Sequence, residues 1–182
     1  MICLDIFLLS LPPHASEVLK DNIHPPSVCY SLLSLDVLGM HLLQQKANTL
    51  KASEYETLLK FEQRFGWQLD LQALLSAEYS ALVVTTASQQ ILWVNKGFTQ
   101  MSGYSKSFAV GRKPSFLQGE KTCGHTSSRI REQLQAQVPF TETVLNYRKN
   151  GQLYLCQVSI TPLVNSRGEL THFIALEKEL TL

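Results

Sequence analysis

The spacing of apolar residues along this chain changes once, near residue 70, and the change separates two kinds of secondary structure. Between Ser31 and Gln45 leucines recur at three- and four-residue steps, which is the stripe of an amphipathic helix. A second helix is predicted to begin at the run Ser53-Glu54-Tyr55-Glu56, which has the form of a capping box, and to end at Gly66. Residues 1–69 are therefore predicted to form a helical N-terminal extension.

Beyond Asp70 short β-branched or aromatic segments alternate with turn residues, and this pattern is typical of strands. A short helix is predicted over residues 71–75, small helical pieces over 96–118, and a longer helix over 122–137. The predicted strands cover residues 81–85, 91–95, 141–148, 152–162 and 170–177. Residues 70–182 are thus predicted to form a second region, a domain that contains both helices and strands.

Three connections between the predicted strands have the composition of turns. Asn150-Gly151 is the strongest hairpin signal, because a type I′ turn needs a positive φ at both of its central positions. Ser88-Gln89-Gln90 and Ser166-Arg167-Gly168 are predicted to be the turns of the other two connections. The strands that flank each turn are expected to be neighbours in one sheet.

Charge and hydropathy exclude several classes of partner. The 182 residues include 16 basic and 15 acidic side chains, and the net charge of +1 gives no clustered basic surface for nucleic acid. The apolar segment from Met1 to Leu11 is far shorter than the roughly 20 residues that span a bilayer, so a cytoplasmic protein without a membrane segment is expected. One local group of cations is expected to lie on a solvated helix face, namely Arg112, Lys113, Arg129 and Arg131.

Cysteine usage and the absence of catalytic motifs point away from metal chemistry and enzymes. The cysteines have no paired spacing, which favours a reduced intracellular chain; they are Cys3, Cys29, Cys123 and Cys156. The run Cys123-Gly124-His125 is too small to form a metal site by itself, and no metal is predicted. The sequence contains no nucleophile elbow, phosphate loop or dinucleotide fingerprint, so we expect a protein without catalytic activity, whose output comes from a partner protein.

Three parts of the sequence resemble the motifs of PAS domains, a family of sensor modules. Trp93-Val94-Asn95-Lys96-Gly97-Phe98, with Met101-Ser102-Gly103-Tyr104-Ser105, resembles the family's V-N-x-x-F and T-G-Y-S runs. Residues 111–119 and 146–151 resemble the signatures G-R-N-C-R-F-L-Q-G and N-Y-R-K-D-G of the flavin-binding light-oxygen-voltage (LOV) branch. The resemblance covers residues 76–180 and implies an α+β PAS fold, in which a five-stranded antiparallel sheet carries short helices on one face. The whole chain is also similar to short stand-alone PAS proteins of Bacteroidetes-type bacteria.

In the LOV signature a cysteine forms a covalent adduct with flavin under blue light, and this sequence has Pro114 at that position. Proline has no thiol, so the resemblance implies the frame of a sensor without cysteinyl-flavin photochemistry. Lys113 and Ser115 replace the neighbouring asparagine and arginine. A thiol supplied by Cys156 from a neighbouring strand is a separate hypothesis, and its alternative is that Cys156 is a small buried apolar residue.

The resemblance also assigns positions in a binding pocket. Asn146 corresponds to an asparagine that contacts the flavin ring, and Gln118 and Arg131 correspond to residues that contact the phosphate tail. Cys156 and Glu177 replace a second ring-contacting asparagine and the glutamine that reports the state of the flavin. The resulting set of predicted cofactor-binding residues is Gln118, Arg131, Asn146, Cys156, Glu177, Lys113 and Pro114.

The identity of the ligand stays open at this point. The pocket is predicted to hold a flavin such as FMN, to hold another small molecule, or to be filled by side chains. Glu177 matters most to this choice, because a buried carboxylate must be protonated or paired, and Lys113 is the candidate partner. An ionised glutamate also only accepts hydrogen bonds, whereas glutamine both donates and accepts.

Strand alternation predicts an apolar patch on the sheet face opposite the pocket. Residues expected to face outward are Leu145, Tyr147, Leu155, Ile174 and Leu176. Such a patch needs a cover, which is expected to be the chain's own helices within residues 32–65, a protein partner or a second copy in a homodimer. The leading interpretation is therefore a PAS regulatory module that acts through protein contacts, with or without a small ligand as its trigger. The alternatives are a flavin-binding redox or light-responsive protein and a ligand-free interaction scaffold.

Overall fold

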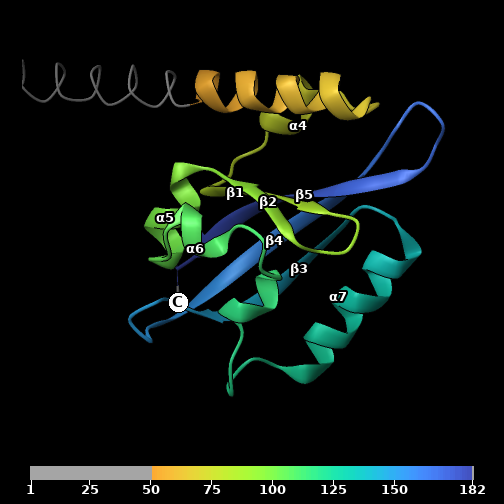
Figure 1. Ribbon diagram of the computed structural model, residues 1–182. Helices are drawn as coiled ribbons and strands as arrows, with labels where there is room; N and C mark the ends of the chain where they lie inside the picture. The colour runs from red at the N-terminus through yellow and green to blue at the C-terminus, as the bar shows by residue number, and fades with distance from the viewer. Residues whose placement is uncertain (1–50, 182) are drawn as a thin grey trace, which may run out of the picture. The chain divides into compact units, whose positions relative to one another are not determined.

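The computed structural model describes residues 51–181 and contains one five-stranded antiparallel sheet (Figure 1). The strands lie in the order β2-β1-β5-β4-β3, and they are β1 (Ala81–Thr86), β2 (Ile91–Val94), β3 (Phe140–Tyr147), β4 (Leu153–Val164) and β5 (Leu170–Leu180). The helices are α4 (Leu71–Leu75), α5 (Lys96–Ser102), α6 (Lys106–Ala109), the 3-10 helix η1 (Pro114–Leu117) and α7 (Gly124–Ala136). Residues 51–65 are also helical and are called helix 51–65. The predicted α+β class and the five antiparallel strands are confirmed.

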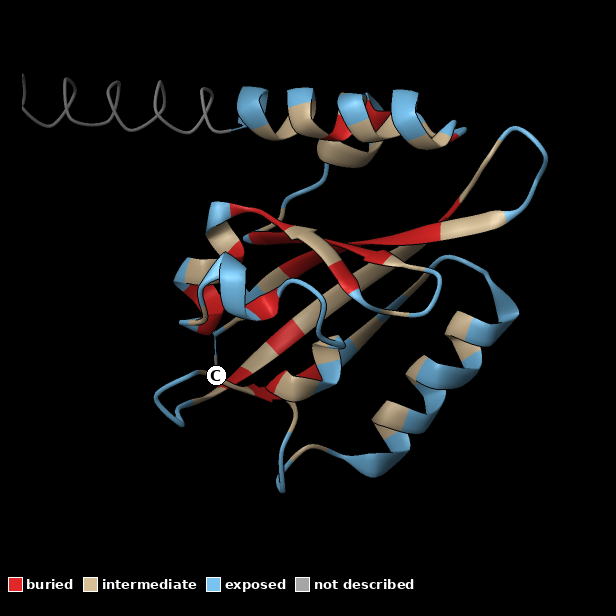
Figure 2. Ribbon diagram, viewed as in Figure 1, coloured by how far each residue is buried: buried red, intermediate tan, exposed pale blue. Residues whose placement is uncertain are grey.

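Both faces of the central strands are covered (Figure 2). Successive side chains of a strand point to opposite sides of the sheet, and consecutive residues of β1 are buried. On the inner face, Ala81 and Val83 of β1 and Ala175 of β5 pack with Phe98 of α5 and Leu117 of η1. On the outer face, β1 and β5 pack with helix 51–65 and α4 in a cluster that we call the outer cluster. Its buried members are Leu58, Trp67, Leu71, Leu82, Val84, Leu163, Ile174 and Leu176.

Helix 51–65 contributes to the same compact unit as the sheet, which spans Ser53–Leu182. Its end is the predicted one, since Gly66 has a φ of 67°, the left-handed conformation that favours glycine after a helix. The predicted capping box is wrong. Residues 51 and 52 are already helical, and the Ser53 carbonyl accepts a hydrogen bond from the Thr57 hydroxyl (2.9 Å). Ser53 therefore lies inside the helix, where it cannot act as its N-cap.

The predicted leucine stripe of residues 31–45 lies outside the described residues. The division of the chain into 1–69 and 70–182 remains a prediction.

Glu54 connects helix 51–65 to the sheet. Its carboxylate accepts hydrogen bonds from the Asn95 side-chain amide (2.8 Å) and from the Tyr79 hydroxyl (2.8 Å). Asn95 is the N-cap of α5, and its Oδ1 accepts from the backbone amides of Leu82 in β1 (3.0 Å) and Phe98 in α5 (2.9 Å). A single asparagine thus links helix 51–65, a central strand and α5.

Aromatic rings fill the space between the end of helix 51–65 and β5. The ring centroids of Phe65 and Trp67 lie 4.3 Å and 5.2 Å from that of His172. The Trp67 indole N–H donates to His172 Nδ1 (3.3 Å) and to the Thr171 hydroxyl (3.1 Å). Nδ1 accepts only when it carries no proton, and burial lowers the pKa of His172, which favours that form.

Asn150-Gly151 lies in the hairpin between β3 and β4, but the turn is not of the predicted type I′. Gly151 has a φ of 84°, whereas Asn150 is not among the described residues with positive φ. The Gly151 amide donates to the Arg148 carbonyl (2.9 Å), which is the pattern of a type I turn followed by a left-handed glycine. Asn150 Oδ1 accepts from the Gln152 amide (3.0 Å), so asparagine serves this turn through its side chain and not through an unusual φ.

The outer face of the sheet is covered unevenly. Two of the residues predicted to face outward, Ile174 and Leu176, lie in the outer cluster. Two others, Leu145 and Leu155, are half-buried. Tyr147 is covered by the loop before α7. Its ring packs so closely on Gly119 that a Cβ at that residue would lie 2.6 Å from a ring carbon. Its hydroxyl accepts a hydrogen bond from the Lys121 amide (2.9 Å). The described part of the chain therefore supplies a cover for β1 and β5 but leaves part of β3 and β4 accessible.

Candidate functional site

A cavity of about 170 Å³ lies between the inner face of the sheet and α7. One water needs only roughly 10–15 Å³ of such volume, so there is room for a larger molecule. The side chains of α7 that line the cavity are at helical spacing, yet no residue of α7 is buried. The helix therefore stands away from the sheet, and the space between them is not filled by side chains. The apolar lining consists mainly of Val83, Leu117, Ile130, Leu134, Val144, Val158, Ile160 and Ala175.

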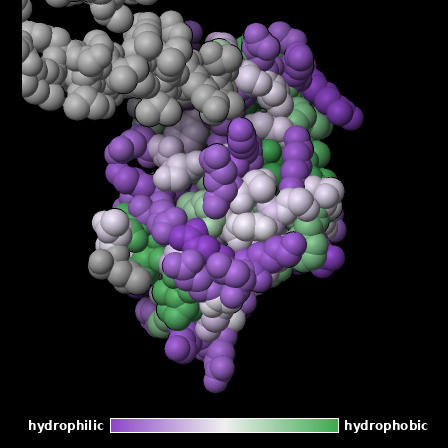
Figure 3. All heavy atoms as spheres, turned by 90° about the vertical axis from the view of Figure 1, so that its left-hand side faces the viewer, coloured by the Kyte–Doolittle hydropathy of each residue, from purple (hydrophilic) through white to green (hydrophobic). Residues whose placement is uncertain are grey.

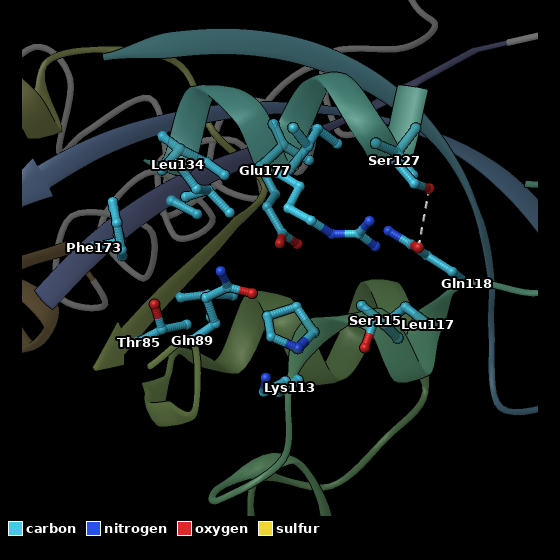
Figure 4. A pocket seen from close by; sticks show the side chains of 18 of the residues that line it. Thr85, Gln89, Lys113, Ser115, Leu117, Gln118, Ser127, Leu134, Phe173 and Glu177 are labelled. Atoms are coloured by element: carbon cyan, nitrogen blue, oxygen red, sulfur yellow. Dashed lines mark hydrogen bonds between the residues drawn. The ribbon is translucent and has the colours of Figure 1, made fainter. Parts of the chain in front are cut away.

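Glu177 places a carboxyl group at the base of this mainly apolar cavity. It is 5% exposed, and within the described residues its Oε2 atom has no hydrogen-bond partner. Figure 4 shows Glu177 pointing from β5 into the cavity. Burial raises the pKa of Glu177 to about 7, because the ionised form loses water without gaining a compensating charge. The neutral and ionised forms are therefore close in free energy at neutral pH.

Two more polar side chains accompany Glu177, one on β3 and one on β4. Asn146 of β3 is buried and lines the cavity, and Tyr154 of β4 lies directly opposite it in the strand register. The Tyr154 hydroxyl is buried, and the Asn146 side chain lies close enough to influence its pKa. Burial, and next the charge of Glu177, raise the pKa of Tyr154, so this phenol stays protonated. Polar groups from β3, β4 and β5 thus gather at one end of the sheet.

The opposite wall carries cations and an amide. Lys113, just before η1, and Arg131, on α7, both line the cavity and are exposed to solvent. The Gln118 side-chain oxygen accepts a hydrogen bond from the Ser127 hydroxyl (3.2 Å), drawn as the dashed line in Figure 4. In residues 51–181 neither cation forms an ion pair with Glu177, so the expected pairing with Lys113 is not present. The cavity has a carboxyl group at its inner end, apolar walls and cations at its rim. This arrangement suits a ligand with an apolar body and an anionic end.

Six of the seven predicted site residues line the cavity, and they are Lys113, Pro114, Gln118, Arg131, Asn146 and Glu177. Cys156 does not. It lies on the same face of β4 as Val158 and Ile160, but two residues further from the cavity, and it is 0% exposed in the core with Met101 of α5. Burial raises the pKa of the Cys156 thiol, which keeps it protonated and unreactive. This placement favours the small buried residue over the reactive thiol.

Sequence reasoning missed several residues that line the cavity. Phe173 and Ala175 precede Glu177 at two-residue steps, so strand alternation carried to the end of β5 would have found them. Gln89 lies in the turn between β1 and β2 and has a φ of 66°, a conformation that glutamine seldom adopts. No signal in the sequence indicates that this side chain reaches the cavity.

The cavity lining has hydrogen-bonding groups and a cation that fit a flavin, but its described residues include no thiol. Asn146 and the unpartnered Glu177 offer hydrogen-bonding groups to a ring edge, and Arg131 offers a cation to a phosphate. No cysteine in the described part of the chain lines the cavity, and Pro114 is one of the lining residues. Cys123 is exposed at the start of α7, and Cys156 is buried in the core. The site therefore has groups for binding a flavin and lacks a thiol beside it.

The other two cations of the predicted group, Arg112 and Arg129, make contacts that do not involve the cavity. Arg129 pairs with Glu142 of β3 (2.8 Å), and the Arg112 guanidinium lies 4.2 Å from the centre of the Phe108 ring. Among residues 51–181 no group of three or more His, Cys, Asp or Glu side chains is arranged to hold a metal ion. Within the same range no helix has the length and apolar character needed to cross a membrane.

The chain belongs to the PAS domain family, because residues 80–181, more than half of its length, match that family. Phototropin-1A of Oryza sativa subsp. japonica is 33% identical over 115 residues, which are 62% of this chain and 12% of that protein. The nitrogen fixation regulatory protein of Klebsiella oxytoca is 28% identical over 102 residues, 56% of this chain and 21% of the relative. A blue-light photoreceptor of Listeria innocua is 30% identical over 103 residues, 55% of this chain and 40% of the relative. The chain thus spans less than half of each of these curated relatives.

Solved structures of LOV domains share this fold. The dark structure of the blue-light photoreceptor Aureochrome1 LOV has a TM-score of 0.58 and 27% identity, and the match covers 63% of this chain and 86% of that one. The LOV domain of a blue-light activated histidine kinase from Erythrobacter litoralis has a TM-score of 0.54 and 29% identity, with 58% and 99% covered. The protein is therefore a PAS sensory domain with LOV domains among its structural neighbours.

The ionisation of Glu177 predicts a pH dependence of stability. Its pKa in the folded protein, about 7, is above the ordinary value of 4.5, so its contribution to stability is full below about pH 4.5 and is lost as the pH rises through about 7. Between about pH 5 and pH 8 the free energy of unfolding of the wild type should fall relative to that of Glu177→Gln by on the order of 2 kcal/mol, since one pKa unit corresponds to roughly 1.4 kcal/mol. Urea unfolding followed by tryptophan fluorescence measures this difference.

The matched control for this measurement is Glu179→Gln, two residues further along β5. Glu179 is partly exposed and pairs with Arg148, so its removal should leave the pH dependence due to Glu177 in place. Equal pH profiles for the wild type and Glu177→Gln would show that Glu177 is not the group responsible.

Proposed function

We propose that this protein is a PAS sensor of a small molecule that signals through protein contacts, without cysteinyl-flavin photochemistry. The observation that supports this proposal most directly is the open cavity with Glu177 at its base, whose buried Oε2 atom has no hydrogen-bond partner among residues 51–181. A buried polar atom without a partner lowers stability. Its presence in a cavity is explained if a ligand supplies the missing hydrogen bond.

FMN is the first candidate ligand. By resemblance Asn146 corresponds to a ring-contacting residue, and Gln118 and Arg131 correspond to residues that contact the phosphate tail; all three line the cavity. When bound, a flavin supplies blue-light absorption and electron transfer. The side chains of this site would hold and orient it, and with Pro114 in place of a cysteine they offer no thiol for an adduct.

The runner-up function is that of a flavin-binding redox or light-responsive protein that works without the adduct. It is favoured by the relatives named as blue-light photoreceptors and by the similarity to LOV structures. A ligand-free scaffold is a weaker candidate, because such a protein has no use for an open cavity with a buried acid.

Output through protein contacts is supported by the surface of the described residues. The face in Figure 3 is mostly hydrophilic, with hydrophobic side chains gathered in separate patches. The large exposed hydrophobic residues in the described range are Phe108, Val110 and Val138. We place the contact with a partner, or with a second copy in a homodimer, on the outer face near Leu145 and Leu155, which are half-buried and are not part of the outer cluster. We also propose that the protein is cytoplasmic and has no catalytic activity of its own.

The first test of the proposed function is a search for a ligand. Purified protein should release a small molecule on denaturation, detected by absorption and mass spectrometry, or should gain thermal stability from one of a panel of compounds that includes FMN and riboflavin. A ligand that binds only the folded state raises the melting temperature by mass action. A protein that releases nothing and is stabilised by none of the panel would contradict the proposal.

Arg131 provides a specific test of the rim. Arg131→Ala should weaken the binding of FMN by roughly tenfold or more, because a charge-assisted hydrogen bond to phosphate is worth about 1.5–3 kcal/mol, and should change the binding of riboflavin little. Arg129→Ala is the control, since Arg129 lies on the same helix but pairs with Glu142 and does not line the cavity. Equal losses for FMN and riboflavin would show that Arg131 does not contact the phosphate.

A further inference from the structure

We propose that ligand binding in this cavity is coupled to a proton, with Glu177 entering the complex as a neutral acid that donates a hydrogen bond to an acceptor atom on an uncharged planar ring. The inference rests on the proposed function, because it takes the cavity to be the ligand site. It goes further by assigning the polarity of the ligand edge that faces β5 and the direction in which pH changes affinity.

Titratable side chains of β4, α7 and the segment before η1 lie around Glu177. Tyr154 and Cys156 face it from β4, and Arg131 and Lys113 line the same cavity from α7 and from the segment before η1. Tyr154 and Cys156 both keep their protons, since burial raises the pKa of each. The two cations are exposed at the rim, and in the part of the chain that the structure describes neither forms an ion pair with the Glu177 carboxylate. An ionised Glu177 is thus without compensation.

A bound ligand changes the free-energy difference between neutral and ionised Glu177. A molecule that fills the cavity displaces the water that remains there and makes the ionised carboxylate less favourable still. An anionic end of the ligand, if present, would occupy Arg131 and Lys113 and remove them as partners for Glu177. Binding therefore favours the neutral acid. Above about pH 7, the value to which burial raises the pKa of Glu177, the acid must take its proton from solvent.

The neutral form of Glu177 restricts the class of ligand. A neutral carboxylic acid has one O–H donor, whereas the ionised group only accepts. The unpartnered Oε2 atom of Glu177 lies at the base of a cavity whose walls are mainly apolar. The group that meets it is therefore a hydrogen-bond acceptor, and the proposed function makes it a carbonyl oxygen or a ring nitrogen at the edge of a flavin-like ring. A ligand with a cationic or donor edge would instead bind the carboxylate and would bind better at high pH.

The experiment uses the full chain and riboflavin, which has no phosphate and no group that titrates between about pH 6 and pH 8. The dissociation constant, measured from the change in flavin fluorescence, should be about tenfold larger at about pH 8 than at about pH 6 for the wild type. Glu177→Gln should change by less than about twofold over this range, because its amide donates a hydrogen bond at either pH. Glu179→Gln, with its acid removed from an exposed position on the same strand, should retain the wild-type dependence.

Proton uptake is a second measurement, and it needs no variant. Calorimetric titration of the wild type with riboflavin at about pH 8, in two buffers with different ionisation enthalpies, should show the uptake of close to one proton per ligand bound. No proton uptake at about pH 8 overturns the inference, because it means that Glu177 is ionised in the complex. Binding that tightens as the pH rises overturns it too, because the ionised carboxylate then pairs with Arg131 or with a donor edge of the ligand. If neither riboflavin nor FMN binds at any pH, the ring class is wrong, while the proposed function is still decided separately by the ligand panel.

Discussion

Replacing Gly97 with alanine is expected to destabilise the protein by about 3 kcal/mol or more. Gly97 lies in the first turn of α5, and a Cβ there would be 1.9 Å from the carbonyl oxygen of Ser80 and 3.0 Å from its carbonyl carbon. These are backbone atoms, so they cannot rotate away. The Ser80 amide donates to the Glu177 carbonyl (2.7 Å), which holds that backbone against β5. Alanine would force α5 off the sheet, and overpacking of this kind usually costs 1–3 kcal/mol even where side chains can adjust.

Gly124→Ala is the matched control for Gly97. Gly124 is also in the first turn of a helix, α7, but no atom lies within 4 Å of a Cβ at this position and its φ is not positive. The substitution should leave stability unchanged or raise it by up to about 1 kcal/mol, because alanine loses less backbone entropy on folding. Urea unfolding followed by circular dichroism gives both values. Similar stabilities for the two variants would contradict the close approach of α5 to β1.

Replacing Leu58 with alanine is expected to lower the free energy of unfolding by about 3–5 kcal/mol, which is the range for buried leucines whose cavity does not collapse. Leu58 is 0% exposed and packs in the outer cluster with Leu82 and Ile174. Glu56→Ala is the control on the exposed side of the same helix and should change stability by less than about 0.5 kcal/mol. A loss below about 1 kcal/mol for Leu58→Ala would mean that helix 51–65 is not docked on the sheet in solution.

Deletion of residues 1–66 tests the same contact more severely. It removes Leu58 together with Glu54, and it exposes Leu82, Ile174 and Leu176 to water at about 25 cal/mol per Å² of apolar surface. The shortened protein should be less stable and should bind a hydrophobic dye. A truncated protein that is as soluble and as stable as the full chain would contradict the assigned role of helix 51–65.

The residues of the candidate site that were predicted from sequence are those that a motif marked. Six of the seven residues assigned by resemblance line the cavity, because the spacing of the motif preserves which strand and which helix each residue belongs to. Cys156 fails because alternation gives the correct face of β4 but not how far along the strand the cavity extends. Gln89 has no signal at all, since its place in the lining depends on a turn with an unusual φ. The state of Glu177 depends on how much water reaches it, which no local pattern contains.

The sequence by itself determined the number and order of the strands, the face that each strand residue presents, and the absence of a thiol at position 114. These properties depend on side-chain periodicity and residue identity, which are local. Only the tertiary structure decided that α7 stands away from the sheet, that Glu54 and Asn95 join helix 51–65 to β1, and that the Glu177 Oε2 atom has no partner among the residues described. Those properties depend on distances between segments far apart in the chain, where burial and pairing are set by atoms that are not neighbours in sequence.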